Sequence, residues 1–92
     1  MIKSFKDEDT ERLFQNEKVK RWRSIETVAR RKLLMIDAAE QLNDLKAPPR
    51  NRLHSLKQDR EGQHAIRIND QYRVCFAWRE GNAYEVEITD YH

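Results

Sequence analysis

The stretch IRINDQYRVCFAWREGNAYEVEI, residues 66–88, alternates apolar and polar side chains with a period of two. Such alternation is typical of β-strands that bury only one face. The large apolar residues here all have even numbers: Ile66, Ile68, Tyr72, Val74, Phe76, Trp78, Tyr84, Val86 and Ile88. The pattern therefore predicts antiparallel strands whose even-numbered side chains share one core face, provided that each connecting loop has an odd number of residues.

Two short segments supply loops of that kind. NDQ (69–71) and EGN (80–82) contain Asn, Asp and Gly, which tolerate tight or left-handed turns. With three-residue loops, the opposite face of the sheet would carry the odd-numbered residues Arg67, Arg73, Cys75, Ala77, Arg79, Glu85, Glu87 and Thr89. We expect this polar face to be open, so that a phosphate could lie against its arginines.

The first half of the chain has a helical period. MIKSF (1–5) predicts a short strand, and DEDTERLFQN (7–16) predicts a short helix with acids at its N-terminus. Ser24 is the predicted cap of a longer helix that ends before KAPPR (46–50). Its apolar stripe is Ile25, Val28, Ala29, Met35, Ile36, Ala39 and Leu42, widened by Leu34, Ala38 and Leu45. These elements predict an α+β fold, with two N-terminal helices packed on a mainly antiparallel β-sheet.

Length and composition limit the possibilities further. Ninety-two residues suit a single domain, 1–92, with one core. The lone cysteine, Cys75, cannot form an internal disulfide, and no apolar stretch is long enough for a signal sequence or a membrane span. We therefore expect a cytoplasmic protein with no membrane association. With two glycines, the chain has neither a P-loop nor a GxSxG motif.

Positive charge is concentrated in the middle of the chain. Seven basic residues lie between Lys18 and Lys32 against one acid, and five lie between Lys46 and Arg60 against one acid, although the net charge is only +2. We call these two segments the basic zone. A polyanion could dock on it, or it could be a solvated helix surface laced with ion pairs.

The three histidines, His54, His64 and His92, do not have the spacing of paired metal ligands, so we predict neither a metal nor another cofactor. A metal-dependent nuclease that uses all three remains an alternative. His54 lies in RNRLHSLKQDREG (50–62), where its basic neighbours are Arg50, Arg52, Lys57 and Arg60. When a ribose 2′-OH attacks an RNA phosphate, a base removes a proton, cations offset the developing charge and an acid protonates the leaving oxygen. Asp90, Tyr91 and His92 add further proton-transfer groups, or form only a polar tail.

The order RLHSLKQDREGQHAIRINDQYRVCFAW (52–78) followed by ITDYH (88–92) resembles the HigB killer toxins of the RelE superfamily. The resemblance implies a RelE-like, microbial-RNase-like fold and a metal-independent, ribosome-dependent endoribonuclease. Such an enzyme cleaves mRNA in the ribosomal A site and thereby inhibits translation. It also implies three kinds of partner: the 70S ribosome with its message, a HigA-like helix-turn-helix antitoxin, and operator DNA only through the antitoxin complex.

The resemblance also implies site residues. The predicted catalytic residues are His54, Arg73, Asp90, Tyr91 and His92, and Lys57 is predicted to bind the phosphate. Arg67 stands in the RxNxQxRxxF stretch of the family, where its role could be phosphate binding or only solubility. Because they surround His54 with positive charge, Arg50, Arg52 and Arg60 are also predicted to bind RNA. Either His54 or His92 could be the acid, and either Asp90 or Tyr91 could be the base or orient a neighbour. We expect the last strand to bring residues 90–92 to the rim of the RNA cleft. The alternative function is a non-catalytic basic module that binds RNA or the ribosome.

Overall fold

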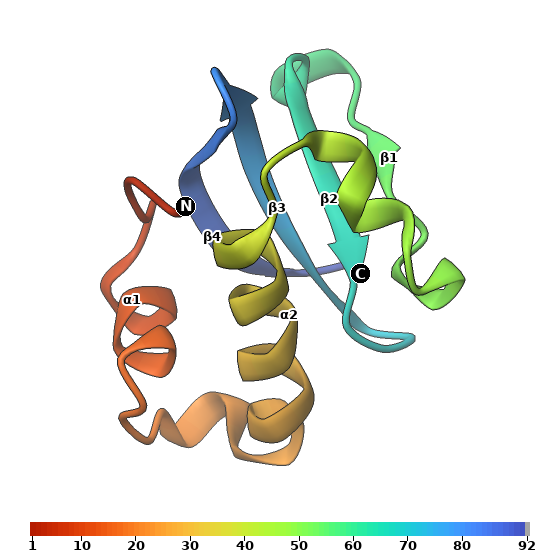
Figure 1. Ribbon diagram of the computed structural model, residues 1–92. Coiled ribbons are helices and arrows are strands. Elements are labelled where there is room, and N and C mark those ends of the chain that lie inside the picture. The colour runs from red at the N-terminus through yellow and green to blue at the C-terminus, as the bar shows by residue number, and fades with distance from the viewer. Residues whose placement is uncertain (92) are drawn as a thin grey trace.

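The computed structural model describes residues 1–91 and consists of a helical layer on a sheet. The α-helices are α1 (Glu8–Phe14) and α2 (Glu26–Ala38), and the strands are β1 (His54–Ser55), β2 (Gln63–Arg67), β3 (Tyr72–Arg79) and β4 (Asn82–Asp90). Short 3₁₀ helices lie in the connections: η1 (Lys20–Ile25), η2 (Leu42–Lys46), η3 (Pro49–Asn51) and η4 (Gln58–Arg60). The strands form one antiparallel sheet in the order β1-β2-β3-β4. Figure 1 shows α2 lying across one face of this sheet, so the predicted α+β fold is confirmed.

The core lies between α2 and the sheet face that it covers. Ala29, Leu33 and Ile36 are fully buried on α2, at the three- and four-residue spacing of one helix stripe. The sheet contributes fully buried even-numbered residues, namely Ile66, Val74, Phe76 and Val86. Each large side chain removed from water in this way contributes about 1.5–3 kcal/mol. The predicted core face is therefore confirmed over β2, β3 and the second half of β4.

The two hairpins differ in their loops. Ile68 donates its backbone N–H to Tyr72, which closes the predicted three-residue loop 69–71, and the side chain of Asn69 accepts the backbone N–H of Gln71 at 2.8 Å. In the next hairpin, Arg79 pairs with Asn82, so the loop is Glu80-Gly81 and not EGN. Both loop residues have positive φ, 50° and 81°, as a type I′ turn requires.

The shorter loop reverses the alternation at the start of β4. Ala83 pairs with Trp78 and is fully buried, while Tyr84 pairs with Ala77 on the opposite face. The prediction that Tyr84 belongs to the core face is therefore wrong. A bulge then shifts the register between Cys75 and Ala77 of β3, and Glu85 of the bulge has a φ of 51°. The extra residue returns Val86 and Ile88 to the core.

The helix boundaries also differ from the prediction. Ser24 lies within η1, and Ile25 precedes α2 without a capping side chain, so Ser24 is not the helix cap. The helix ends at Ala38 because Ala39 is extended, and Leu42 and Leu45 lie in η2 instead. There the Asp44 carboxylate accepts the backbone N–H groups of Glu40 and Gln41, both at 3.0 Å, which starts a separate turn. Three of the predicted stripe residues are exposed, Val28, Leu34 and Ala38.

The N-terminal segment lies beside β4 but is not a continuous strand. Ile2 and Phe5 form isolated parallel bridges with Ala83 and Val86, one on each side of the bulge. The hydroxyl of Ser4 accepts the backbone N–H of Glu85 at 2.9 Å between these bridges. The segment thereby covers part of an exposed sheet edge. Within residues 1–91, no helix is long and apolar enough to cross a membrane.

Candidate active site

The sheet face that points away from α2 carries the candidate site, and we call it the outer face. Strand pairing places Arg67 of β2 beside Arg73 of β3, and Arg73 beside Thr89 of β4. The outer face is less open than predicted, because Leu56 packs on Ala65 and Cys75 and both of these residues are fully buried. The open part of the face lies toward the C-terminal end of β4.

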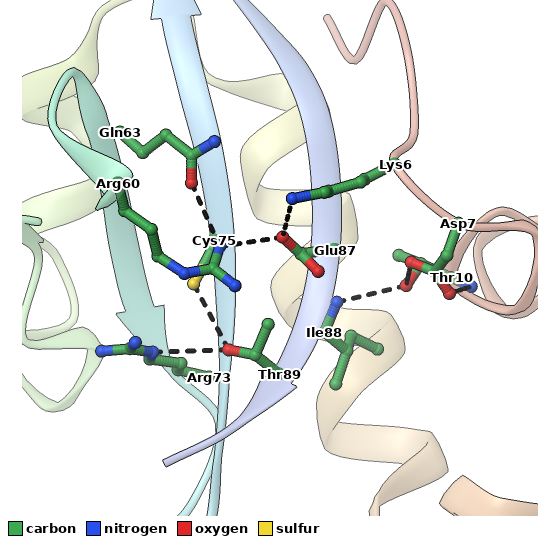
Figure 2. Close-up of polar contacts among 10 residues, drawn as sticks. All are labelled: Lys6, Asp7, Thr10, Arg60, Gln63, Arg73, Cys75, Glu87, Ile88 and Thr89. Carbon is green, nitrogen blue, oxygen red and sulfur yellow. Dashed lines mark hydrogen bonds and ion pairs between the residues drawn. The ribbon is translucent and has the colours of Figure 1, made fainter.

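Arg73 is held from the side by β4. Its Nε donates to Thr89 Oγ1 at 3.4 Å, and the same hydroxyl lies 3.3 Å from Cys75 Sγ (Figure 2). The guanidinium carbon lies 5.2 Å from the centre of the Tyr91 ring, within the range of a cation–π interaction. Arg73 and Tyr91 are thus brought together as predicted. The N–H groups of Arg73 other than Nε lie on the outer face, where this side chain is half-buried.

A surface depression adjoins this pair. Its volume is about 370 Å³, and Arg52, Arg67, Asp70 and Tyr91 line it. Arg67 forms an ion pair with Asp70, whose side chain is 98% exposed. Two of the predicted phosphate ligands, Arg52 and Arg67, therefore share one depression with the predicted catalytic phenol.

His54 lies on β1 and also belongs to the outer face, because it pairs with Ala65. Its Nδ1 is 2.8 Å from the backbone oxygen of Arg52. Since a carbonyl oxygen only accepts, Nδ1 carries the hydrogen, and the exposed ring keeps Nε2 for another proton. This hydrogen bond orients the imidazole and leaves Nε2 open for a bound substrate.

Arg60 is bound to the protein rather than extended toward solvent. It donates to Glu87 Oε2 at 2.8 Å and to Gln63 Oε1 at 3.3 Å, and Figure 2 shows its side chain reaching across Cys75 toward β4. Glu87 is also 3.4 Å from the ammonium of Lys6. The hydrogen bond that Arg60 donates to Glu87 raises the pKa of Arg60, so the guanidinium keeps its charge. This contact fixes η4, which follows the exposed Lys57, over the sheet.

The remaining predicted residues are not gathered at Arg73. Asp90 pairs with Tyr72, and strand alternation directs it to the face opposite Thr89, where Gln71 Nε2 donates to its Oδ2 at 3.0 Å. Arg50 is exposed on η3 and lines a different hollow, which it shares with Arg67. His92 lies outside the described residues.

The histidines do not converge on a metal centre in the described part of the chain. Ser55 pairs with His64 while His54 pairs with Ala65, so alternation places His54 and His64 on opposite faces of the sheet. The His64 ring packs 6.1 Å from the Phe76 ring, and burial lowers the pKa of His64. Residues 1–91 contain no group of three His, Cys, Asp or Glu side chains that could hold a metal ion.

The basic zone divides into two kinds of residue. Arg21 pairs with Asp9 at 3.2 Å, and Arg30 donates to the backbone oxygen of Leu13 at 3.0 Å, so these cations stabilise the helical layer. Lys32 is buried. The exposed cations that remain are Lys18, Lys20, Arg23, Arg31, Lys46, Arg50, Arg52 and Lys57.

Sequence reasoning missed three residues that organise this region. Thr89 positions Arg73, Glu87 binds Arg60, and Asn51 binds Lys32. The odd numbering of Thr89 and Glu87 was a usable signal, because it placed both on the face of Arg73. Asn51 and Lys32 are nineteen residues apart, and no periodic pattern links them.

Comparisons with known proteins identify similar chains. A family model described as "RelE-like toxin of type II toxin-antitoxin system HigB" matches residues 3–92. Toxin HigB-1 of Vibrio cholerae is 40% identical over 85 residues, which cover 90% of each chain. Endoribonuclease HigB of Proteus vulgaris is 35% identical over 94 residues, which cover the whole of both chains. An uncharacterized protein of Haemophilus influenzae is 43% identical over 51 residues, or 55% of this chain and 50% of its own.

Proposed function

The chain belongs to the HigB family of RelE-like toxins from type II toxin–antitoxin systems, and we propose that it is an endoribonuclease that cuts mRNA in the ribosomal A site. Its family implies an antitoxin as partner. The similar protein of Proteus vulgaris carries the name endoribonuclease, which supports the same activity here. Cleavage of translated message would inhibit protein synthesis.

The observation that carries the proposal is the convergence of Arg73, Arg67 and Tyr91 at the open end of the outer face. Arginine binds a phosphate through two parallel hydrogen bonds, and its charge offsets the negative charge that builds up on the phosphate during attack. Arg73 is already oriented by Thr89, so little reorganisation is needed when RNA arrives. We assign Arg73 to the scissile phosphate.

Proton transfer is assigned to His54, Asp90, Tyr91 and His92, of which Tyr91 contacts this arginine. His54 presents Nε2 from β1, and Tyr91 presents its hydroxyl from the end of β4 beside the Arg73 guanidinium. The proposal includes Asp90 and His92 as the remaining acid and base candidates, and Lys57 as a second phosphate ligand. Asp90 would act from the strand edge, where Gln71 orients it. The ribosome would complete the site by bending the message against the outer face.

The exposed cations suggest how the protein reaches the ribosome. Lys18, Lys20 and Arg23 surround one hollow near α2, and Arg50 and Arg52 lie near the candidate site. A polyanion that touches several such cations releases condensed counterions, so binding weakens steeply with salt. We propose that these residues dock on ribosomal RNA, in the cytoplasm. We further propose a HigA-like helix-turn-helix antitoxin as the partner, with operator DNA bound only by the antitoxin complex.

Cleavage mapping tests the activity. Purified protein is mixed with 70S ribosomes translating a defined message, and in parallel with the same RNA alone, and the new ends are mapped by primer extension. Cuts that appear only in translated message, within the A-site codon, are expected. The protein with Arg73→Ala should bind ribosomes but not cut. Binding without any cut by the wild-type protein would instead identify a non-catalytic module.

A further inference from the structure

We propose that a cationic hollow between α2 and β2 binds a flanking phosphate of the RNA substrate, one step along the strand from the scissile phosphate. The inference rests on the proposed nuclease function and extends its substrate path. The hollow has a volume of about 350 Å³, and its cations are Arg31 and Lys32 of α2, Arg50 of η3 and Arg67 of β2. We call it the α2 hollow. Its lining contains no acidic residue, and the rest of its wall is apolar.

Lys32 is a buried cation held in a fixed position at the wall of this hollow. Its side chain is only 8% exposed, and its Nζ donates to Asn51 Oδ1 at 2.6 Å. Asn51 is fully buried, and its Nδ2 donates to the backbone oxygens of Leu45 at 3.1 Å and Ala47 at 3.3 Å. These two carbonyls fix the amide so that its oxygen faces the lysine. The ammonium is therefore held in one place at the wall of the hollow.

The hydrogen-bond partner of the Lys32 ammonium is the neutral amide of Asn51. A buried charge, however, needs a counter-charge. None of the ion pairs found within residues 1–91 includes Lys32. Burial lowers the pKa of Lys32, and the nearby Arg31 and Arg67 lower it further. A buried charge is costly unless it is compensated. A phosphate in the hollow would supply two oxygens with negative charge to Lys32 and to the arginine forks around it.

Position and size favour RNA as the occupant. Arg67 lines both the α2 hollow and the depression that holds Arg52 and Tyr91, so the two cavities adjoin at this side chain. RNA carries one phosphate per nucleotide, and a strand held at Arg73 must place further phosphates nearby. The volume lies at the small end of ligand pockets, which suits one nucleotide better than a helix of a partner protein. Val28 and Ile68 offer apolar contact for its sugar or base.

The test uses RNA that the enzyme cannot cut. Oligonucleotides with 2′-O-methyl riboses, a hexamer and a dimer, are titrated into the wild-type protein and the variants Lys32→Met and Arg31→Gln. Each variant should weaken hexamer binding by roughly tenfold or more, since one charge-assisted hydrogen bond is lost. The salt dependence should also become shallower, by about 0.7 in logarithmic slope per lost contact. The dimer, too short to span both cavities, should bind all three proteins equally, and Lys3→Gln provides an exposed, charge-matched control.

A second measurement distinguishes a phosphate-binding role of Lys32 from a purely structural one. The pKa of Lys32, followed by NMR at its side-chain carbon next to the ammonium, should rise when the hexamer binds, because a phosphate favours the charged form. An unchanged pKa, or hexamer binding by both variants equal to wild type, overturns the inference. Arg31 is exposed, so Arg31→Gln keeps the test valid even if Lys32→Met unfolds.

The remaining outcomes separate this inference from its rivals. If the variants bind the hexamer normally but lose affinity for the antitoxin, the α2 hollow takes an acidic segment of that protein and the RNA assignment is wrong. If the variants cut programmed ribosomes and bind the hexamer as the wild type does, the inference fails while the proposed function stands. If the wild-type protein does not cut at all, the proposed function itself has failed.

Discussion

The two faces of the sheet are built from the same strands but from different chemistry. On the face under α2, Val74, Phe76 and Val86 are fully buried, and their contribution is to stability. On the outer face, Arg73 and Thr89 alternate with those residues and contact each other through polar atoms. Because successive side chains of a strand point to opposite faces, stability and chemistry are interleaved at single-residue spacing. Substitutions one position apart should therefore have effects of different kinds.

The largest expected effect comes from the core face. Phe76→Ala would remove a fully buried ring and leave a cavity, which costs about 3–5 kcal/mol. A small domain has only about 5–15 kcal/mol of stability, so this variant should be largely unfolded at moderate urea concentrations. Urea unfolding followed by far-UV CD measures the loss. On the outer face one position along, Ala77→Ser should change the free energy of unfolding by less than about 0.5 kcal/mol. Similar losses in both variants would contradict the division between the faces.

The outer face should show the reverse behaviour at Arg73. Arg73→Ala should lower the rate of cleavage on programmed ribosomes by roughly 10²- to 10³-fold while leaving the unfolding free energy near wild type. Arg73→Lys should restore little, because an ammonium cannot reproduce the two-pronged contact of a guanidinium.

Arg79→Ala is the matched control for Arg73, since Arg79 lies on the same strand and the same face but stacks on Tyr84 at the other end. It should cut like the wild type. Full activity of Arg73→Lys would show that charge alone matters at this position.

Local pattern explains how much of the fold was predictable. The even-numbered apolar residues of β2 and β3 identified the core face correctly, because burial of one sheet face imposes a period of two. The error at Tyr84 arose because two defects compensate: the two-residue turn at Glu80-Gly81 shifts the register, and the bulge at Glu85 shifts it back. A sequence pattern reports the net parity and not where each shift occurs. The helix stripe also ran past Ala38, because η2 repeats similar spacing after a break.

The grouping of the candidate site residues was predictable only where strand parity or family resemblance indicated it. Arg67, Arg73 and Tyr91 were placed on or near one face by parity and by family resemblance, and the structure does bring them together. Arg60 was grouped with the RNA ligands because it is basic and near His54 in sequence. Its partner, Glu87, is twenty-seven residues away, and only the tertiary fold places that carboxylate within 2.8 Å. Long-range pairing of charges is the information that a single sequence does not contain.

The ion pair of Arg60 offers an intermediate effect on the outer face. Glu87→Gln would remove the charge that holds Arg60 and Lys6, although the partly exposed Arg60 limits the loss. We expect a loss of about 1 kcal/mol in unfolding free energy. A modest fall in cleavage should accompany it, because η4 and the adjacent Lys57 become less fixed. Lys6→Gln removes only the exposed contact and should have a smaller effect on both measurements. Equal effects of the two substitutions would mean that Arg60 does not depend on Glu87.

The smallest expected effect concerns Lys32, the cation on the helix side of this division. Its folded-state pKa is lowered, mainly by burial, so the charged form is less favourable in the fold than in the unfolded chain. That cost is fully present below the folded pKa and disappears as pH rises toward the unfolded value of about 10.4. The wild-type protein should therefore gain stability relative to Lys32→Met between pH 7 and pH 10. The acceptor left unpaired on Asn51 in the variant costs the same at every pH and cancels from this difference.

Urea unfolding of both proteins at three pH values measures the trend, and Lys3→Gln, which changes an exposed lysine, should show a flat difference. A flat difference for Lys32→Met as well would mean that the ammonium is as well solvated as the exposed cations around the site, and the case for an anion in the α2 hollow would lose its electrostatic basis.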